Sequence, residues 1–252
     1  MKTTMRMCLK KTIWRSLKLY GYRRCVCKKK IRIRVANRVK RVRWCAGKRN
    51  WTVENDWRKV IFSDESQIVI GNDCRIYVWR KSNESWFSDC ISPGIGKKIS
   101  VMIWGCITYH GVGTLCRVIG NINSEKYVDI LDNKLWPVIA RHFPDNTYMF
   151  MDDNAPVHRS NFSTNYKFNN KFIIMLEWPA QSPDLNPIEN VWLAIKRKLQ
   201  SHIHRINTAA ELFEKISEIW TSFTVEYIKS LYVSLPKRVR RVQQARGYIT
   251  KY

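Results

Sequence analysis

The sequence predicts an α/β fold in which helices cover a mixed sheet. Two apolar strand patterns surround a glycine-rich turn within residues 101–120, and a third apolar run lies before them at residues 59–71. Toward the C-terminus, segments with helical spacing alternate with further strand patterns, which is typical of a mixed sheet with helical layers. At 252 residues and 45% hydrophobic residues, the chain can fill a substantial core.

The N-terminal part is expected to be helical and basic. Residues 9–19 place Leu9, Ile13, Trp14 and Leu17 at helical spacing among Lys and Arg, which predicts a short amphipathic helix. Gly21 ends it, and a basic linker follows. Residues 35–48 return to helical character, and residues 50–57 are interpreted as the entry into the main domain.

Five segments of the main domain are expected to be strands or paired strands. They are residues 59–71 (KVIFSDESQIVIG), 75–80 (RIYVWR), the window 101–120, 147–153 (TYMFMDD) and 171–178 (KFIIMLEW). That window is the most apolar stretch, but His110, four glycines and Arg117 interrupt it. Since no run of 18 apolar residues exists, we expect no membrane span.

Helices are expected between and after these strands. Residues 124–142 have helical spacing with Ser124 as N-cap, and Pro137 is expected to bend or interrupt them. Residues 158–170 form a further predicted helix, and another runs from residue 187 to about residue 201. Thr208 and Glu211 have capping-box spacing before a long amphipathic helical region.

Positive charge is concentrated at the two ends of the chain. The formal net charge is +25; residues 1–59 carry 21 Lys/Arg against 2 Asp/Glu, and residues 237–252 carry 6 against none. Such ends favour nucleic acid as partner, because Lys and Arg that neutralise phosphates release condensed counterions. Solvated tails and an anionic membrane surface are the alternatives.

The expected phosphate contacts are sequence-independent and come from both basic ends. The run KKKIRIR (28–34) is compatible with phosphate contact or with nuclear import, so we expect a nuclear location. The residues expected to bind DNA are Arg23, Arg24, Lys28, Lys29, Lys30, Arg32, Arg34, Lys237, Arg238, Arg240 and Arg241.

The cysteines do not predict a disulfide framework. The eight cysteines include no C-x-x-C pair, and a chain with an ordinary core needs no disulfides, so reduced thiols are expected. Zinc-ligand spacing, a Walker-type loop and the G-x-S-x-G motif are also absent from the sequence.

Three carboxylates stand out by position. Asp64 interrupts an apolar strand, Asp153 sits where a strand gives way to the turn NAPVH, and Glu189 lies in the first turn of a predicted helix. Strand ends and helix starts that meet at one edge of an α/β sheet are where sites form. Oxygen ligands of this kind suit Mg²⁺, and two such ions clamp the attacking and leaving oxygens of a phosphoryl displacement.

Each carboxylate also has a purely structural interpretation. Asp64 can end a strand, and Asp153 can serve as a turn aspartate. With Asn186 as N-cap and Pro187 at N1, Glu189 falls at the capping-box position, so spacing alone favours a cap. His158, at the mouth of the expected site, can be a DNA-positioning or a structural residue.

Five motifs in order resemble the Tc/mariner superfamily of cut-and-paste DNA transposases. They are FSDES (62–66), WGCI (104–107), DNAPVHRS (153–160), WPAQSPDLNPIENVW (178–192) and LPKRV (235–239). The resemblance runs from about residue 10 to the C-terminus. It implies a catalytic domain of ribonuclease H-like fold with a metal-binding triad of Asp64, Asp153 and Glu189. The resemblance therefore favours a metal-ligand role for Glu189 over the capping role that spacing alone favours.

The resemblance also implies cofactors and partners. Two Mg²⁺ ions, replaceable by Mn²⁺, are expected at the triad, and the DNA partners are transposon ends and target. In such transposases water first cleaves a phosphodiester at the transposon end, and the freed 3′-hydroxyl then attacks target DNA. A homodimer is a further expectation, and no membrane partner is expected. The alternative is a DNA-binding protein derived from a transposase without catalysis.

Two departures from the pattern bear on this expectation. Position 152 is Asp where relatives usually have Gln, and Asp152 is expected to lie behind the site or in solvent, because neighbouring strand residues point to opposite faces. The second departure is at the N-terminus, because such transposases carry two helix-turn-helix units there and only about 55 residues precede the catalytic domain here. Residues 1–58 are therefore interpreted as the end of the second helix-turn-helix unit plus a linker. Residues 59–205 are the expected catalytic domain, and residues 206–252 a C-terminal helical region with a basic tail.

Overall fold

The computed structural model describes residues 12–23, 30–71, 80–87, 90, 98–169 and 174–252. The chain divides into two compact units, Met1–Arg32 and Ile33–Tyr252. In the first unit residues 12–19 are helical, which confirms that part of the predicted basic helix. Within the described ranges, no helix is both long and apolar enough to cross a membrane.

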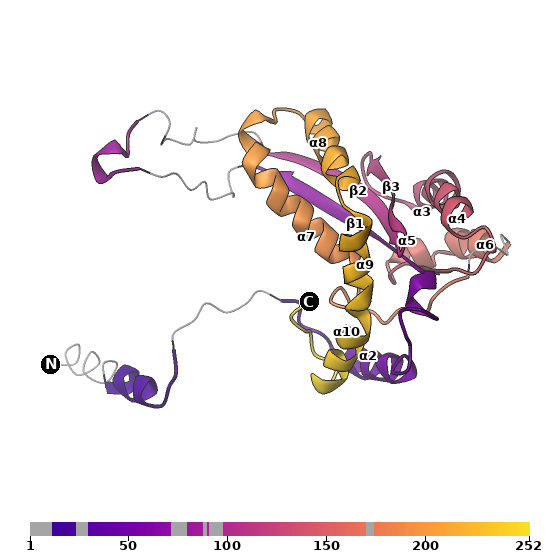
Figure 1. The fold of residues 1–252 in the computed structure, drawn as a ribbon, viewed down its shortest axis with the longest axis horizontal. Helices are drawn as coiled ribbons and strands as arrows, with labels where there is room; N and C mark the ends of the chain where they lie inside the picture. The colour runs from indigo at the N-terminus through magenta and orange to yellow at the C-terminus, as the bar shows by residue number, and fades with distance from the viewer. Residues whose placement is uncertain (1–11, 24–29, 72–79, 88–89, 91–97, 170–173) are drawn as a thin grey trace. The chain divides into compact units, whose positions relative to one another are not determined.

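The second unit is built on a mixed sheet of four strands in the order β3-β2-β1-β4 (Figure 1). The strands are β1 (Val60–Ile70), β2 (Ile99–Thr108), β3 (Gly111–Val118) and β4 (Met149–Met151). β1 pairs antiparallel with β2 and parallel with β4, and β2 pairs antiparallel with β3. The sheet confirms the strands predicted at residues 59–71, in the window 101–120 and at 147–153.

The two other predicted strands are described only in part. Residues 72–79, which include most of the predicted strand 75–80, lie outside the described residues. From the predicted strand 171–178, only residues 174–178 are described, and they contribute a single parallel bridge between Phe150 and Met175. Their backbone therefore follows β4 for one pairing and then leaves the sheet.

One face of the sheet is covered by α3 (Ser124–Ile130), a π-helical turn (Leu131–Leu135) and α4 (Trp136–His142). Ile61, Trp104 and Cys106 point into this layer, as the alternation along their strands requires. Asn123, rather than Ser124, is the N-cap of α3, because its side chain accepts the amide hydrogen of Lys126. The π-helical turn directly before Pro137 is the interruption that the proline predicted.

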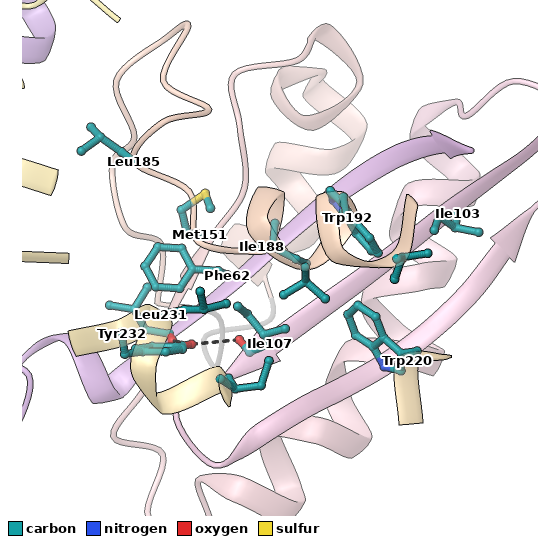
Figure 2. Close-up of a cluster of buried hydrophobic side chains, with 14 of the residues drawn as sticks. Phe62, Ile103, Ile107, Met151, Leu185, Ile188, Trp192, Trp220, Leu231 and Tyr232 are labelled. Atoms are coloured by element: carbon teal, nitrogen blue, oxygen red, sulfur yellow. Dashed lines mark hydrogen bonds between the residues drawn. The ribbon is translucent and has the colours of Figure 1, made fainter. Parts of the chain in front are cut away.

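The opposite face carries α7 (Ile188–Leu199), α8 (Ala209–Thr221) and α9 (Val225–Val233). Figure 2 shows Phe62 and Ile107 of the sheet beside Tyr232 of this helical layer, and Trp192 belongs to the same buried cluster. The Tyr232 hydroxyl donates to the carbonyl oxygens of Val60 and Ile107 and so ties α9 to two strands. Thr208 caps α8 by accepting the amide hydrogen of Glu211, as its spacing predicted.

The predicted boundaries at residues 58/59 and 205/206 do not separate compact units. α2 (Val35–Gly47) packs against α10 (Leu235–Gln244), and the same hydrophobic core contains Cys45, Trp57 and Val239. α2 and α10 therefore belong to the same compact unit as the sheet, because both helices bury apolar side chains in its core. The division into residues 1–58, 59–205 and 206–252 stays a prediction, while the compact units of the structure meet at residues 32/33.

Candidate active site

Asp64 lies in the middle of β1, on the face that α7 covers. It pairs in register with Gly105, and its side chain is half-buried. Trp192 of α7 donates its indole N–H to Asp64 Oδ2 at 3.2 Å. The sheet and α7 therefore fix the first carboxylate together.

Asp153 lies two residues after the end of β4, and its side chain remains 53% exposed. Its Oδ1 accepts the amide hydrogen of Ala155 at 2.7 Å and is 2.7 Å from Nδ1 of His158. Burial works to raise the pKa of Asp153, but these hydrogen bonds lower it overall, which keeps the carboxylate ionised. Asp153 closes a turn, as one of its two interpretations expected, and its carboxylate remains accessible at the sheet edge.

Glu189 is exposed in the first turn of α7, whose N-cap is Pro187 rather than the predicted Asn186. Asn186 nevertheless works at the helix start, because its Oδ1 accepts from the amide of Ile188 at 3.3 Å. Its Nδ2 donates to the carbonyl of Ser63, the residue before Asp64. The start of α7 is thereby anchored to β1, next to the first carboxylate.

The carboxylates interact electrostatically. Burial first, and then the charges of Glu189, Glu65 and Asp153, raise the pKa of Asp64 well above its usual value. Among the described ion pairs, none joins Asp64 to a Lys or Arg. A divalent cation would remove this repulsion, and carboxylate oxygens are the ligands it prefers, so Asp64, Asp153 and Glu189 fit such an ion chemically. As the side chains stand, however, no three acidic, His or Cys groups of the described chain converge into a closed metal cage.

His158 joins the second carboxylate to the other face of β1. The ring is 3% exposed, and its Nε2 is 3.3 Å from Oε1 of Glu65 while Nδ1 meets Asp153. Burial opposes protonation, yet the hydrogen bonds to Asp153 and Glu65 raise the pKa of His158 to about 10. His158 is thus a buried cation that holds two carboxylates, a role for which its place in the motif gave no signal.

Asp152 is buried behind the site, as one of its two predicted placements required. It is 1% exposed and accepts hydrogen bonds from the Tyr127 hydroxyl at 2.7 Å, from Lys167 and from Arg159. Lys167 Nζ also donates to the carbonyl oxygen of His158 at 3.1 Å. The buried pair of Asp152 and Lys167 therefore supports the turn that carries Asp153 and His158.

The residues expected to bind DNA fall into three groups. Arg23, Lys30, Arg32, Arg34, Lys237 and Arg240 are exposed, and Arg241 is half-buried. Arg24, Lys28 and Lys29 lie outside the described residues.

The prediction for Arg238 is wrong. Its side chain is 1% exposed and donates to Ser234, Asp184 and Asn190, so it is not presented to a phosphate. Its helix buries the positions of Leu235, Val239 and Val242, and Arg238 lies on the same face. Helical periodicity was therefore the signal that separated Arg238 from its exposed neighbours.

The fold and the site define the class of protein. Residues 59–212 match the family described as DDE superfamily endonuclease. The structure is similar to that of the Mos1 transposase paired-end complex with left transposon end, with a TM-score of 0.76 and 19% identity over 96% of this chain and 71% of that one. It also resembles the crystal structure of the catalytic domain of Mos1 mariner transposase, with a TM-score of 0.69 and 16% identity over 89% of this chain and 100% of that one.

Proteins related in sequence identify the family within this class. The chain is 33% identical over 245 residues to the transposable element Tcb1 transposase of Caenorhabditis briggsae, covering 96% of this chain and 88% of that one. It is 32% identical over 248 residues to the transposable element Tc1 transposase of Caenorhabditis elegans, with the same coverage. The chain belongs to the Tc/mariner transposases of the DDE superfamily, and its mixed sheet is the predicted ribonuclease H-like fold.

Proposed function

We propose that this chain cleaves DNA phosphodiesters and transfers DNA strands during cut-and-paste transposition, with Asp64, Asp153 and Glu189 as metal ligands. The observation that carries the proposal is the placement of the three carboxylates. Asp64 lies in β1, Asp153 follows β4, which pairs with β1, and Glu189 lies in the first turn of α7, the helix whose Trp192 binds Asp64. Membership of the DDE endonuclease family supports the same assignment.

Mg²⁺ is the cofactor that these ligands favour, with Mn²⁺ as a substitute and two ions as the expected number. When bound, the ions activate the attacking oxygen and stabilise the leaving one. The protein's own groups do the rest: Trp192 orients Asp64, His158 and Ala155 orient Asp153, and the start of α7 carries Glu189. A bound cation would also neutralise the charge repulsion at Asp64.

Double-stranded DNA is the proposed partner, and α2 and α10 offer it a cationic surface. The two helices pack together, and neither residues 33–49 nor residues 237–252 contain an acidic residue. The exposed or half-buried cations of this α2/α10 surface include Arg34, Lys40, Arg43, Lys237, Arg240 and Arg241. Phosphate contacts from such a surface would position DNA without reading its sequence. A homodimer and a nuclear location complete the proposal.

A nicking assay on supercoiled DNA with Mg²⁺ tests the proposal. Wild type is compared with Asp64→Asn, Asp153→Asn and Glu189→Gln, each of which removes one charge with little change in shape. We expect each substitution to abolish Mg²⁺-dependent nicking while DNA binding, measured by fluorescence anisotropy, persists. A wild-type protein that binds DNA but never nicks it would instead support the non-catalytic DNA-binding alternative.

A further inference from the structure

Arg238 of α10 connects three separate parts of the protein through its guanidinium group. Nε donates to Ser234 Oγ at 2.8 Å, Nη1 to the carbonyl oxygen of Asp184 at 3.1 Å, and Nη2 to Asn190 Oδ1 at 2.6 Å. Asp184 lies in the loop before α7, and Asn190 lies in the first turn of α7. One side chain therefore spans the loop and the helix start that flank Glu189.

The burial of Arg238 is costly for its charge. All three acceptors are neutral oxygens, which compensate a buried cation less well than a carboxylate does. Burial lowers the pKa of Arg238 to about 10, although the group stays protonated at neutral pH, and the ring of Tyr252 lies 4.6 Å from the guanidinium carbon. An apolar side chain would fill this position at a lower cost in free energy. It could not, however, form hydrogen bonds to both the loop before α7 and the first turn of α7.

The neighbours of Glu189 are held from both sides. Asn190 is bound by Arg238 through its side chain, and its carbonyl oxygen accepts from the Tyr227 hydroxyl at 3.4 Å. On the other side, Asn186 binds the carbonyl of Ser63 in β1. Helix ends fray readily, so a first turn that must present a side chain accurately needs such anchors.

We propose that Arg238 is a positioning residue for Glu189, fixing the first turn of α7 through Asn190 and Asp184 so that Glu189 keeps its place at the helix start that is anchored to β1 beside Asp64. The inference rests on the proposed function of Glu189 as a metal ligand. Groups that orient metal ligands from behind typically change metal affinity or activity about 10–100-fold when they are removed. Arg238 has this effect because its planar fork binds two acceptors at once.

The test measures Mn²⁺ binding by calorimetry on the full chain without DNA, followed by Mn²⁺-dependent nicking. The variants are Arg238→Met, which removes the fork, Arg238→Lys, which keeps the charge without the fork, and Asn190→Ala, which removes one acceptor. Arg141→Met, an exposed arginine at the end of α4, controls for the loss of one positive charge.

We expect Arg238→Met and Asn190→Ala to weaken Mn²⁺ binding by about tenfold or more. The Mn²⁺ affinity of Arg238→Lys should lie between that of these variants and that of wild type. The Mn²⁺ affinity of Arg141→Met should equal that of wild type. Nicking by Arg238→Lys should recover substantially at saturating Mn²⁺. If Arg238→Met does not fold, Arg238→Lys and Asn190→Ala carry the test.

Unchanged Mn²⁺ affinity in folded Arg238→Lys and Asn190→Ala would overturn the positioning role while leaving the proposed function intact. Equal weakening in Arg141→Met would overturn it as well, because the effect would then be one of net charge. If wild type itself bound no Mn²⁺, both the inference and the metal-ligand assignment would fall.

Discussion

Asp184 and Arg41 form an ion pair at 2.8 Å in which both side chains are 0% exposed. The same Oδ2 of Asp184 accepts from the amide and the hydroxyl of Thr250, and Arg41 also donates to the carbonyl oxygen of Gly247. The loop before α7, helix α2 and the C-terminal segment therefore meet at one buried charge pair.

Breaking this pair on one side should cost more than removing it entirely. Arg41→Met leaves Asp184 buried without its cation, and we expect the free energy of unfolding to fall by about 3–5 kcal/mol. The double variant Arg41→Met with Asp184→Asn should lose less than the sum of the single variants, because no uncompensated charge remains. Urea unfolding measures both; strict additivity would contradict the coupling.

Asp152 and Asp153 should respond oppositely to the same substitution. Asp152→Asn leaves Lys167 buried without its carboxylate, so we expect a loss of stability of about 3–5 kcal/mol but retained nicking below the unfolding temperature. Asp153→Asn should abolish nicking and lose less stability than Asp152→Asn, because His158 keeps Glu65 as its other carboxylate partner. Thermal denaturation and the nicking assay separate the two; abolished nicking in folded Asp152→Asn with retained nicking in Asp153→Asn would reverse the assignment.

Gly105 leaves room for two tryptophans beside Asp64. A Cβ atom there would lie 2.9 Å from Trp192 and 3.0 Å from Trp220. We expect Gly105→Ala to destabilise the protein by about 1–3 kcal/mol through overpacking and to reduce nicking, since Trp192 also orients Asp64. Gly47→Ala, where nothing lies within 4 Å of the new Cβ, is the matched control and should be close to neutral.

Buried thiols should be unreactive in the native state. Burial raises the pKa of both Cys45 and Cys106 to about 12, so their thiolate fraction at pH 8 is very small. Iodoacetamide treatment at pH 8 followed by peptide mass spectrometry should leave both unmodified until urea unfolds the protein. Rapid iodoacetamide labelling of either cysteine in the native protein would show that the part of the core around it unfolds locally.

The exposed cations of α10 should control the salt dependence of DNA binding. Replacing Lys237, Arg240 and Arg241 together by Gln should weaken binding on all DNA sequences alike. The slope of log K against log salt should become shallower by about 0.9 for each DNA phosphate that the variant no longer neutralises. Anisotropy titrations between low and moderate salt measure this. An unchanged slope would show that other cations of the protein neutralise the phosphates.

The sequence was most informative where one residue decides one local structure. The apolar run around Asp64 predicted β1, the spacing of Thr208 and Glu211 predicted a cap, and the motif order predicted the family. Arg238 was misjudged because a run of cations looks exposed unless its helical phase is followed. The roles of Glu65 and His158 could not be read from spacing, since 92 residues separate them and only the sheet brings them together.

The C-terminal segment is anchored to the interior through a few contacts, although of residues 245–252 only Gly247 is buried. Gly247 has φ 78°, and a Cβ there would lie 2.4 Å from the carbonyl oxygen of Arg38, so only glycine fits. Arg41 relies on the carbonyl oxygen of Gly247, and Asp184 relies on Thr250. A stop codon in place of Gly247 would thus inactivate a copy of this gene almost as surely as an early frameshift, and purification tags are better placed at the N-terminus.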